Sequence, residues 1–391
     1  MSANERFDVI IVGAGPSGSV CAEHLAAHGA RVLLVDKKSP GWHKPCGGGI
    51  SAPTLRRFGI PRSLGFETSG VRVVDRHGHE IRPPMRYYDV YRNRFDEHLA
   101  ERARKAGAEV AFGEALADVE RGGAGFIVKT ARRTAESKYL VGADGCMSAV
   151  RRKLFSEQLP EESCALAIEH WYRIPHGIRS LDFYIEPEIL RTGYAYVFPK
   201  DPETLVIGLA GVGMDAPRAM LERMLELPRY RALIRDTPVD AVHGARIPYR
   251  HLSKLREDRV LLVGDAAGLN TPIIFAGLSI ALQSGRLAGR LCAAALKLGS
   301  DLPLAGYTVD AIHWLSPAFT TCHAYYEHLI AERRPPSFPW LARRFALRPH
   351  KLPQVYIMWN ALNRLVDGLD LERMAVPEPP RAVQSARVPA A

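Results

Sequence analysis

The sequence contains no CxxC pair, no internal repeat, no nucleic-acid-binding motif and no apolar run long enough to cross a membrane. Its six cysteines are scattered, so they predict neither a disulfide framework nor a zinc site, and they are typical of a reducing cytoplasm. Residues 1–6 show no signal segment, and the apolar strand that follows is too short to span a bilayer. We therefore expect a cytoplasmic protein without a metal or a nucleic-acid partner, in contact with a membrane at most at its surface.

The 391 residues are enough for two domains or one large interleaved fold, and 47% of them are hydrophobic, as in ordinary globular proteins. Lysine and arginine outnumber aspartate and glutamate, which gives a formal net charge of +10. Such a charge favours anionic partners such as phosphates or anionic lipids, although it does not choose between them.

A glycine-rich turn near the start of the chain predicts a dinucleotide site. The run "FDVIIV" (7–12) is typical of a buried parallel strand, a helix is expected over 17–28, and "RVLLVD" is a second strand. Between the first strand and the helix, "GAGPSG" places Gly13 for a tight turn, Gly15 for contact with a pyrophosphate, and Gly18 for close packing of helix on strand. The helix N-terminus then stabilises the anion.

An acidic residue follows at the distance that this motif requires. Asp36 ends the second strand, about 20 residues beyond the turn, where a carboxylate accepts hydrogen bonds from a ribose 2′-hydroxyl. This acid favours FAD or NAD over NADP. The sequence contains one such glycine turn, not two.

The remaining pattern predicts two kinds of sheet. A hairpin is expected at 71–82, an inward-facing helix at 93–106 and a long helix at 276–298. Aromatic-rich alternating strands between 164 and 213 predict a separate antiparallel sheet, whereas "RVLLVGD" (259–265) returns to the parallel type. The nucleotide-binding part is therefore assembled from distant segments.

Two later segments, "LVGADG" (140–145) and "RVLLVGDAAG" (259–268), resemble the second and third fingerprints of the flavoprotein hydroxylase superfamily. In that superfamily the aspartate at the position of Asp265 contacts the ribityl chain, and the next helix directs its positive end at the flavin pyrimidine. Because a separate NAD(P) domain would add a second glycine turn, the resemblance implies FAD as the tight cofactor. It also implies that Arg92 lies near the cofactor; the alternative is a solvated arginine at a helix start.

A narrower resemblance comes from two further segments. "KPCGGGI" (44–50) resembles the Pro-Cys-Gly-Gly segment of the geranylgeranyl reductase family, flavoproteins that reduce isolated double bonds in isoprenoid chains. "GYAYVFPK" (193–200) resembles that family's Tyr-x-Trp-x-Phe-Pro box, and Gly208 follows at a compatible distance. Together with the three fingerprints, the resemblance spans about 7–291.

The resemblance implies an α/β fold, in which a Rossmann-like FAD-binding domain is interleaved with an antiparallel-sheet substrate domain and followed by a helical C-terminal region. The expected ranges are 1–75, 90–162 and 255–300 for the FAD-binding domain, 76–89 and 163–254 for the substrate domain, 301–374 for the helical region, and 375–391 for a disordered tail.

It also implies a set of site residues. The expected cofactor-binding residues are Gly13, Gly15, Pro16, Ser17, Gly18, Asp36, Lys37, Cys46, Gly47, Gly48, Gly49, Arg92, Asp144, Gly264, Asp265, Gly277 and Leu278. The three glycines after Cys46 are expected to let backbone lie against the flavin ring. Cys46, Tyr194, Tyr196 or an ordered water are the candidate proton donors; the alternative for Cys46 is a small buried filler.

The expected substrate-binding residues are Tyr194, Tyr196, Phe198 and Phe275. The first three alternate with other residues and so share one sheet face, as a tunnel lining or as ordinary core. The chain departs from the family pattern at two of its expected substrate-binding positions. Tyr196 replaces the usual Trp of the box, and Phe275 stands where the family has the first glycine before its last helix.

The function that this resemblance implies is FAD-dependent saturation of C=C bonds in an isoprenoid or similar lipid, with NADPH or a reduced ferredoxin-like partner protein as electron donor. One alternative is a flavin-dependent monooxygenase of an aromatic or natural-product substrate. A second is a non-catalytic binding protein on the same fold. A halogenase is disfavoured because "HWYRIP" lacks the second Trp of the halogenase signature.

A basic segment offers a route to lipid. Residues 333–351 contain six basic residues and no acid, interleaved with aromatic and leucine side chains. Such a segment can rest on an anionic membrane surface as a peripheral contact. The alternative is a solvated basic helix whose aromatic side chains pack on the domain.

Overall fold

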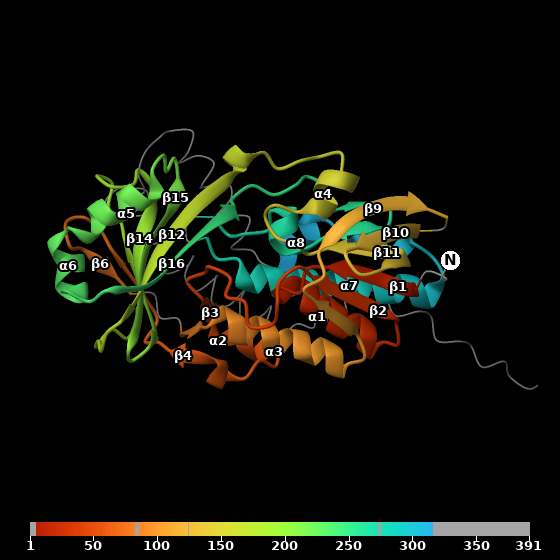
Figure 1. Ribbon diagram of the computed structural model, residues 1–391, viewed down its shortest axis with the longest axis horizontal. Helices are drawn as coiled ribbons and strands as arrows, with labels where there is room; N and C mark the ends of the chain where they lie inside the picture. The colour runs from red at the N-terminus through yellow and green to blue at the C-terminus, as the bar shows by residue number, and fades with distance from the viewer. Residues whose placement is uncertain (1–4, 83–85, 124, 273–274, 316–391) are drawn as a thin grey trace, which may run out of the picture.

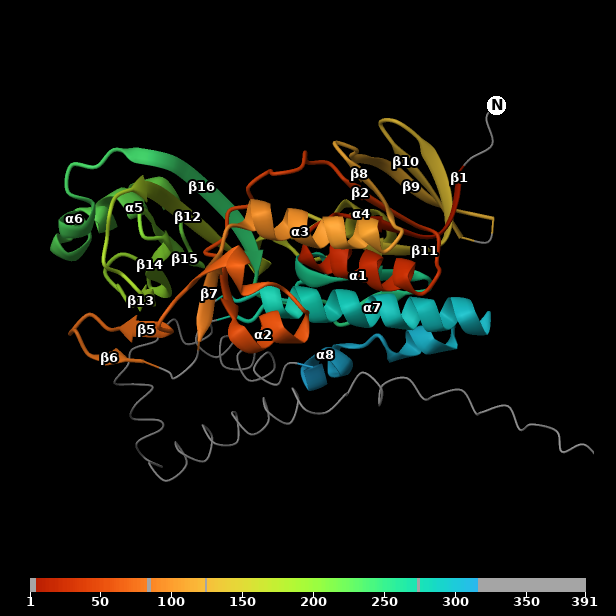
Figure 2. The ribbon, with the colours of Figure 1, turned by 90° about the horizontal axis from the view of Figure 1, so that it is seen from below.

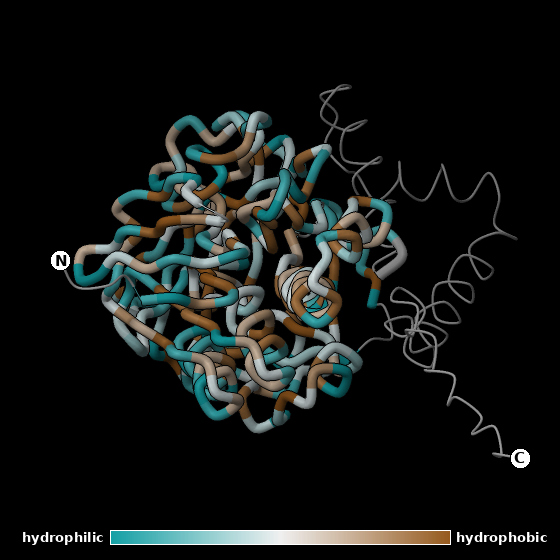
Figure 3. The backbone as a smooth tube through the Cα atoms, turned by 90° about the vertical axis from the view of Figure 1, so that its right-hand side faces the viewer, coloured by the Kyte–Doolittle hydropathy of each residue, from teal (hydrophilic) through white to brown (hydrophobic). Residues whose placement is uncertain are grey.

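The computed structural model describes residues 5–82, 86–123, 125–272 and 275–315. These residues form two halves joined along the long axis of the molecule, with a mainly parallel sheet at one end and a mainly antiparallel sheet at the other (Figure 1). Apolar, brown stretches of the tube cross the interior in Figure 3, and hydrophilic, teal stretches run mostly at the periphery. The expectations for 333–351 and 375–391 lie outside the described residues.

The first sheet is the expected nucleotide-binding sheet. Its eight strands include a path in the order β17-β18-β11-β1-β2-β8, in which β1 is parallel to both β11 and β2. Residues 9–11 of β1 are fully buried because helices and neighbouring strands cover both faces. The strands are β1 (Glu5–Val12), β2 (Val32–Asp36), β8 (Glu109–Phe112), β9 (Leu116–Gly122), β10 (Gly125–Thr130), β11 (Thr134–Gly142), β17 (Arg256–Glu257) and β18 (Val260–Leu262).

Three helices lie side by side against this sheet: α1 (Pro16–Ala27), α3 (Arg92–Lys105) and α7 (Leu278–Leu298) (Figure 2). Helix α7 approaches α1 closely because Gly285 and Gly289 face it one turn apart. A Cβ at Gly289 would lie 3.0 Å from Cys21 O, and one at Gly285 would overlap Ser17 O. This contact places the N-termini of α1 and α7 near each other. Shorter helices are α2 (Ala52–Arg57), α4 (Ala149–Leu154) and α8 (Val309–Leu315).

The second sheet has seven strands in the order β16-β12-β15-β14-β13-β5-β6, all antiparallel except the β13–β5 pair. Its outer face packs under helices α5 (Pro217–Leu225) and α6 (Pro228–Ile234), and its inner face turns to the first half. The strands are β5 (Val71–Val74), β6 (Glu80–Ile81), β12 (Cys164–Arg173), β13 (Leu181–Tyr184), β14 (Thr192–Asp201), β15 (Thr204–Val212) and β16 (Val239–Pro248).

A small third sheet connects the halves. It has the order β3-β7-β4, with β3 (Gly49–Ser51), β4 (Gly65–Glu67) and β7 (Tyr87–Val90). Strand β3 begins at the last glycine of the Cys-Gly-Gly-Gly segment, and β7 ends two residues before α3. This sheet therefore fixes the loop that carries Cys46 relative to both halves.

The predicted hairpin is confirmed by the antiparallel pairing of β5 with β6. The second sheet, however, already begins with β5 at residue 71, whereas residues up to 75 were expected in the FAD-binding part. The parallel partner of β5 is β13, more than 100 residues later, and no local pattern reveals such a pairing. The long helix starts at residue 278 rather than 276 and ends at Gly299, whose φ of 64° closes it.

Candidate active site

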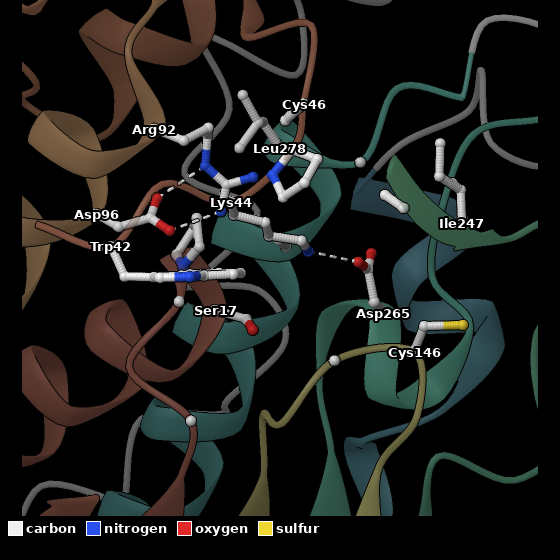
Figure 4. Close-up of a pocket in the computed structure, with 18 of the residues that line it drawn as sticks. Ser17, Trp42, Lys44, Cys46, Arg92, Asp96, Cys146, Ile247, Asp265 and Leu278 are labelled. Carbon is white, nitrogen blue, oxygen red and sulfur yellow. Dashed lines mark hydrogen bonds and ion pairs between the residues drawn. The ribbon is translucent and has the colours of Figure 1, made fainter. Parts of the chain in front are cut away.

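A cavity of about 790 Å³ lies between the two halves, within the range of roughly 300–1,000 Å³ usual for cofactor and ligand sites. Its lining comes from the β1–α1 turn, the 36–49 segment, the start of α3, the 143–147 loop, the inner face of the second sheet and the start of α7 (Figure 4). Every residue expected at the site lines this cavity except Gly18, Gly48 and Gly264, which lie behind its wall.

The glycine turn leaves room for a ligand at one position only. A Cβ on Gly13, whose φ is 109°, would overlap Ala143 O, and a Cβ on Gly18 would overlap Gly13 O. A Cβ on Gly15 would meet no protein atom within 4 Å. Gly13 and Gly18 are therefore required by the protein's own packing, whereas the open space beside Gly15 fits a pyrophosphate at the N-terminus of α1.

Backbone hydrogen bonds fix the carboxylate of Asp36 at the end of β2. Its Oδ2 accepts a hydrogen bond from Ala14 N at 2.7 Å, and its Oδ1 accepts one from Lys38 N at 2.8 Å. Each carboxylate oxygen keeps a second lone pair, so both can still accept from a ribose hydroxyl. The geometry fits the nucleotide that the sequence predicts.

An ion pair crosses the cavity between Lys44 and Asp265. Lys44 Nζ lies 2.8 Å from Asp265 Oδ2 (Figure 4). Asp265 raises the pKa of Lys44 above its ordinary value, although burial opposes the effect. Lys44 was quoted with the Cys-Gly-Gly segment but was not expected in the site, because its partner is more than 200 residues away.

Arg92 is buried rather than solvated, which contradicts the alternative of an exposed arginine at a helix start. Only 3% of its side chain is exposed, and it donates to Asp96 Oδ1 and Oδ2 at 2.8 and 2.6 Å. Burial alone would lower the pKa of Arg92, but Asp96 and the nearby Cys46 thiol outweigh it and raise this pKa. Arg92 is thus a fixed cation in the cavity wall beside Cys46.

The two carboxylate oxygens of Asp144 have different surroundings. Its Oδ2 accepts from Ala149 N at 2.6 Å and Val150 N at 3.2 Å at the start of α4, while its Oδ1 is buried without a partner in the described part of the chain. A buried unsatisfied oxygen that borders the cavity fits a ligand hydroxyl or water.

The Cys-Gly-Gly-Gly segment is crowded by the protein itself at each of its three glycines. A Cβ on Gly47 would lie 2.6 Å from the Phe198 ring, and one on Gly49 would lie 2.9 Å from Leu181 Cδ1. Gly48, with φ of 79°, is enclosed by Val90 O, Asp89 and Lys200. The triplet is therefore explained by contacts with the protein itself.

A buried ion pair holds the segment. Lys200 and Asp89 have fully buried side chains and lie 2.6 Å apart, and Lys200 Nζ also donates to Gly47 O at 2.7 Å. Burial raises the pKa of the Asp89 carboxyl to about 7, against the opposing effect of Lys200. Neither residue was expected in the site. Lys200 follows the aromatic box directly, but its partner comes from β7.

The aromatic wall is confirmed as one face of β14. Tyr194, Tyr196 and Phe198 belong to the inner cluster, whereas Ala195 and Val197 belong to the outer one. Inward-facing aromatic and aliphatic side chains of β12, β13 and β15 continue this wall.

Phe275 lines the cavity without closing it. Its ring centroid lies 5.8 Å from that of Tyr194, and its backbone φ is 47°, in the region that glycine prefers. The backbone therefore keeps the conformation expected for the family's glycine and adds an aromatic ring to the wall.

Glu169 is the functional candidate that sequence reasoning missed. It is 2% exposed, accepts from Trp171 Nε1 at 3.0 Å and from the Tyr196 hydroxyl at 2.7 Å, and lines the cavity. Burial, and then Glu169, raise the pKa of Tyr196 well above its ordinary value. A signal was present: Glu169 shares the inward phase of Ala165, Ala167 and Trp171 in β12.

Comparison with known proteins agrees with this geometry. The family described as FAD binding domain matches residues 6–168. The geranylgeranyl diphosphate reductase of Rhodobacter capsulatus is 31% identical over 317 residues, which cover 77% of this chain and 79% of that protein. The digeranylgeranylglycerophospholipid reductase 2 of Methanopyrus kandleri is 31% identical over 75% of this chain and 78% of its own length.

Solved structures show the same fold. A geranylgeranyl bacteriochlorophyll reductase-like protein of Thermoplasma acidophilum has a TM-score of 0.68 at 24% identity, covering 93% of this chain and 91% of that one. A flavin-dependent brominase has a TM-score of 0.71 at 19% identity, covering 93% and 94%.

The fold and the site define an FAD-dependent oxidoreductase. Within that class, the chain belongs to the geranylgeranyl reductase family. Among the described residues no helix is long and apolar enough to span a membrane.

Proposed function

We propose that this protein saturates carbon–carbon double bonds of an isoprenoid or similar lipidic substrate. One observation carries the proposal: the cavity wall formed by the inner face of the second sheet is mainly aromatic and aliphatic, which suits a prenyl chain. The names of the relatives, geranylgeranyl diphosphate reductase and digeranylgeranylglycerophospholipid reductase, support the same substrate class.

The expected cofactor residues take definite roles in this proposal. The open space at Gly15 and the N-terminus of α1 hold the diphosphate, and Asp36 accepts from the ribose. Asp265 and the start of α7, at Gly277 and Leu278, line the cavity and would hold the ribityl chain and the ring. Lys44, which pairs with Asp265 and also lines the cavity, would help to hold the cofactor.

Reduced FAD, when bound, supplies a hydride to one alkene carbon. The protein's own residues orient the alkene, exclude water and deliver a proton to the other carbon. The aromatic wall orients the chain, and the Lys200–Asp89 pair fixes the loop that places Cys46 beside the wall. Cys46, Tyr194 and Tyr196 remain the candidate donors within reach of the cavity.

The test is an anaerobic incubation of the purified FAD-loaded protein with dithionite and geranylgeranyl diphosphate or a digeranylgeranyl glycerophospholipid. Mass spectrometry should find products heavier by pairs of hydrogen atoms. Product that forms only with oxygen would replace the proposal with a monooxygenase, and protein that takes up no FAD would replace it with a binding function. The control is the same mixture without dithionite.

Cys46 is tested separately by Cys46→Ala and Cys46→Ser. If the thiol donates the proton, both variants bind and reduce flavin normally but lose turnover by roughly 10²-fold or more. Unchanged turnover would leave Cys46 as a packing residue.

The electron donor and the membrane contact complete the proposal. Rapid-mixing absorbance should show flavin bleaching by NADPH or by a reduced ferredoxin, and the faster of the two identifies the donor class.

Cosedimentation with anionic but not neutral vesicles would support peripheral binding through 333–351.

A further inference from the structure

Glu169 is a buried acidic residue in the mainly apolar inner face of the second sheet. A buried carboxylate costs several kcal/mol unless its oxygens are paired or hydrogen-bonded. Here one oxygen accepts from Trp171 and the other from Tyr196. Both hydrogen bonds come from neutral donors rather than from a cation. Packing alone does not explain an acidic side chain at this buried position, which makes Glu169 a candidate functional residue.

The sheet is built so that Tyr196 reaches Glu169. Gly208 of β15 lies between them, paired with Glu169 of β12 on one side and Tyr196 of β14 on the other. A Cβ on Gly208 would lie 2.5 Å from Tyr196 Cζ and 2.6 Å from its hydroxyl oxygen. The tyrosine ring therefore crosses over the middle strand through space that only glycine leaves open.

Electrostatics limits what Tyr196 can do by itself. If its hydroxyl gave up a proton beside an ionised Glu169, two negative charges would lie about 3 Å apart in a buried site. Tyr196 can pass a proton onward only if it receives one from Glu169 in the same step. The net proton that the Glu169–Tyr196 pair loses must therefore be the one that Glu169 held.

A histidine neighbours Glu169 in the sheet. His243 is paired with Glu169 across β16 and lines both the main cavity and a second pocket of about 350 Å³. In that second pocket the ring of His43 lies 4.9 Å from that of His243. Two neighbouring imidazoles thus line the second pocket, and the one next to Glu169 in the sheet also lines the main cavity.

We propose that Glu169 is a positioning and proton-relay residue that acts through Tyr196. Neutral Glu169 gives its proton to the Tyr196 oxygen while the Tyr196 hydroxyl proton moves to one alkene carbon, and the hydride from reduced FAD adds to the other. The alkene gains one hydrogen on each carbon, and Glu169 is left ionised. The two hydrogen bonds that it accepts in this structure stabilise that ionised state. This inference rests on the proposed function.

The test compares Glu169→Gln with wild type under the anaerobic assay described above. Gln keeps the size of Glu and can still accept from Trp171 Nε1, but its NH2 group donates to the Tyr196 oxygen instead of accepting from it, and it has no acidic proton. We expect FAD content, flavin reduction and KM to stay unchanged while kcat falls roughly 10²- to 10⁴-fold. Glu169→Asp should restore part of the rate. Glu186→Gln is the matched control, because Glu186 accepts from Tyr230 at 2.9 Å on the outer side of the sheet.

Two further measurements separate a relay from a structural role. In D₂O the wild type should show a solvent isotope effect that Glu169→Gln abolishes or changes. The infrared difference spectrum between reduced and reoxidised wild type should contain the stretch of a protonated carboxyl that Glu169→Gln lacks. Gly208→Ala should lower kcat by displacing the Tyr196 ring, whereas Gly177→Ala, which meets open space, should not.

The outcomes are distinct. Wild-type protein that makes no saturated product overturns the proposed function and the relay together. Wild-type turnover that Glu169→Gln matches, or the absence of the carboxyl band, overturns the relay and leaves the proposed function in place.

Discussion

Gly13, Gly15 and Gly18 belong to one motif, yet each is glycine for a different physical reason. Gly13 takes a φ of 109°, and Gly18 lies against the backbone of Gly13 itself. Gly15 has an ordinary extended backbone, with φ of −71° and ψ of −177°, and open space where its Cβ would be. The space that a Cβ would fill at Gly15 is therefore needed for the ligand and not for the fold.

This difference gives a prediction for Gly15→Ala. The variant should fold without FAD with a loss of about 1 kcal/mol, since alanine is less favourable than glycine at a helix N-cap. It should lose most FAD affinity, because the methyl group occupies the expected pyrophosphate space. Chemical unfolding of the apoprotein and flavin fluorescence titration measure the two effects. Gly18→Ala should instead unfold the apoprotein, and Gly15→Ala purified with full FAD would contradict the assignment.

Two of the scattered cysteines meet in space. Cys146 Sγ and Cys164 Sγ lie 3.1 Å apart, one in the loop before α4 and the other at the start of β12. The hydrogen bond from Cys146 lowers the pKa of Cys164, while the pKa of Cys146 is raised. Cys164 is therefore the more nucleophilic thiol of the pair.

We accordingly expect diamide to link these two cysteines, with two thiols oxidised and diamide reduced. Peptide mapping without reductant should find the 146–164 link and leave buried Cys21 and Cys292 as free thiols. Cys146→Ser should prevent the link. Recovery of both peptides unlinked after oxidation would show that the thiols do not meet.

At the scale of elements, the segment after β2 depends on strands from both halves. Lys200 of β14 donates a hydrogen bond to Gly47 O and another to Asp89 Oδ1 of β7. Both side chains are fully buried. Removing one partner of such a pair leaves a buried charge, which usually costs 3–5 kcal/mol, whereas removing both costs less.

Lys200→Met should therefore lower the free energy of unfolding by about 3–5 kcal/mol and speed amide exchange across 46–49. Adding Asp89→Asn to Lys200→Met should recover part of the loss, because no uncompensated carboxylate remains. Urea unfolding and hydrogen exchange measure these effects. A double variant no more stable than Lys200→Met would show that the carboxylate is not the source of the cost.

At the scale of the whole molecule, buried histidines make stability depend on pH. Burial, then His28, Arg290 and Arg286, lower the pKa of His24 to about 3 from 6.5. Between those values the unfolded chain binds a proton that the folded protein does not. Stability from this group is therefore present above pH 6.5 and is lost as the pH falls below it.

His24→Gln should flatten this dependence. Between about pH 7.5 and about pH 5, the wild type should lose more of its free energy of unfolding than the variant does. Thermal or urea unfolding at both pH values gives the comparison. His77→Gln is the control, since His77 is exposed in the β5–β6 turn and should leave the slope unchanged. Equal slopes for His24→Gln and wild type would contradict the prediction.

The elements and the cofactor class were predictable because their signals are local. The strand–turn–helix of the nucleotide site, the long helix before Gly299 and the inward phase of Tyr194, Tyr196 and Phe198 all follow from neighbouring residues. The protein contacts of the glycine triplet were not predictable, because the groups that crowd it come from β7, β13 and β14. The site residues that were missed are those whose partners are distant.

By itself, the sequence determined that this chain builds an FAD-type nucleotide turn and an aromatic strand, since hydrophobic period and turn glycines act over about a dozen residues. Only the tertiary structure decided that Glu169 meets Tyr196, 27 residues away, and that Lys200 meets Asp89, 111 residues away. Strand order and register set those contacts, and both depend on how the complete sheets pack.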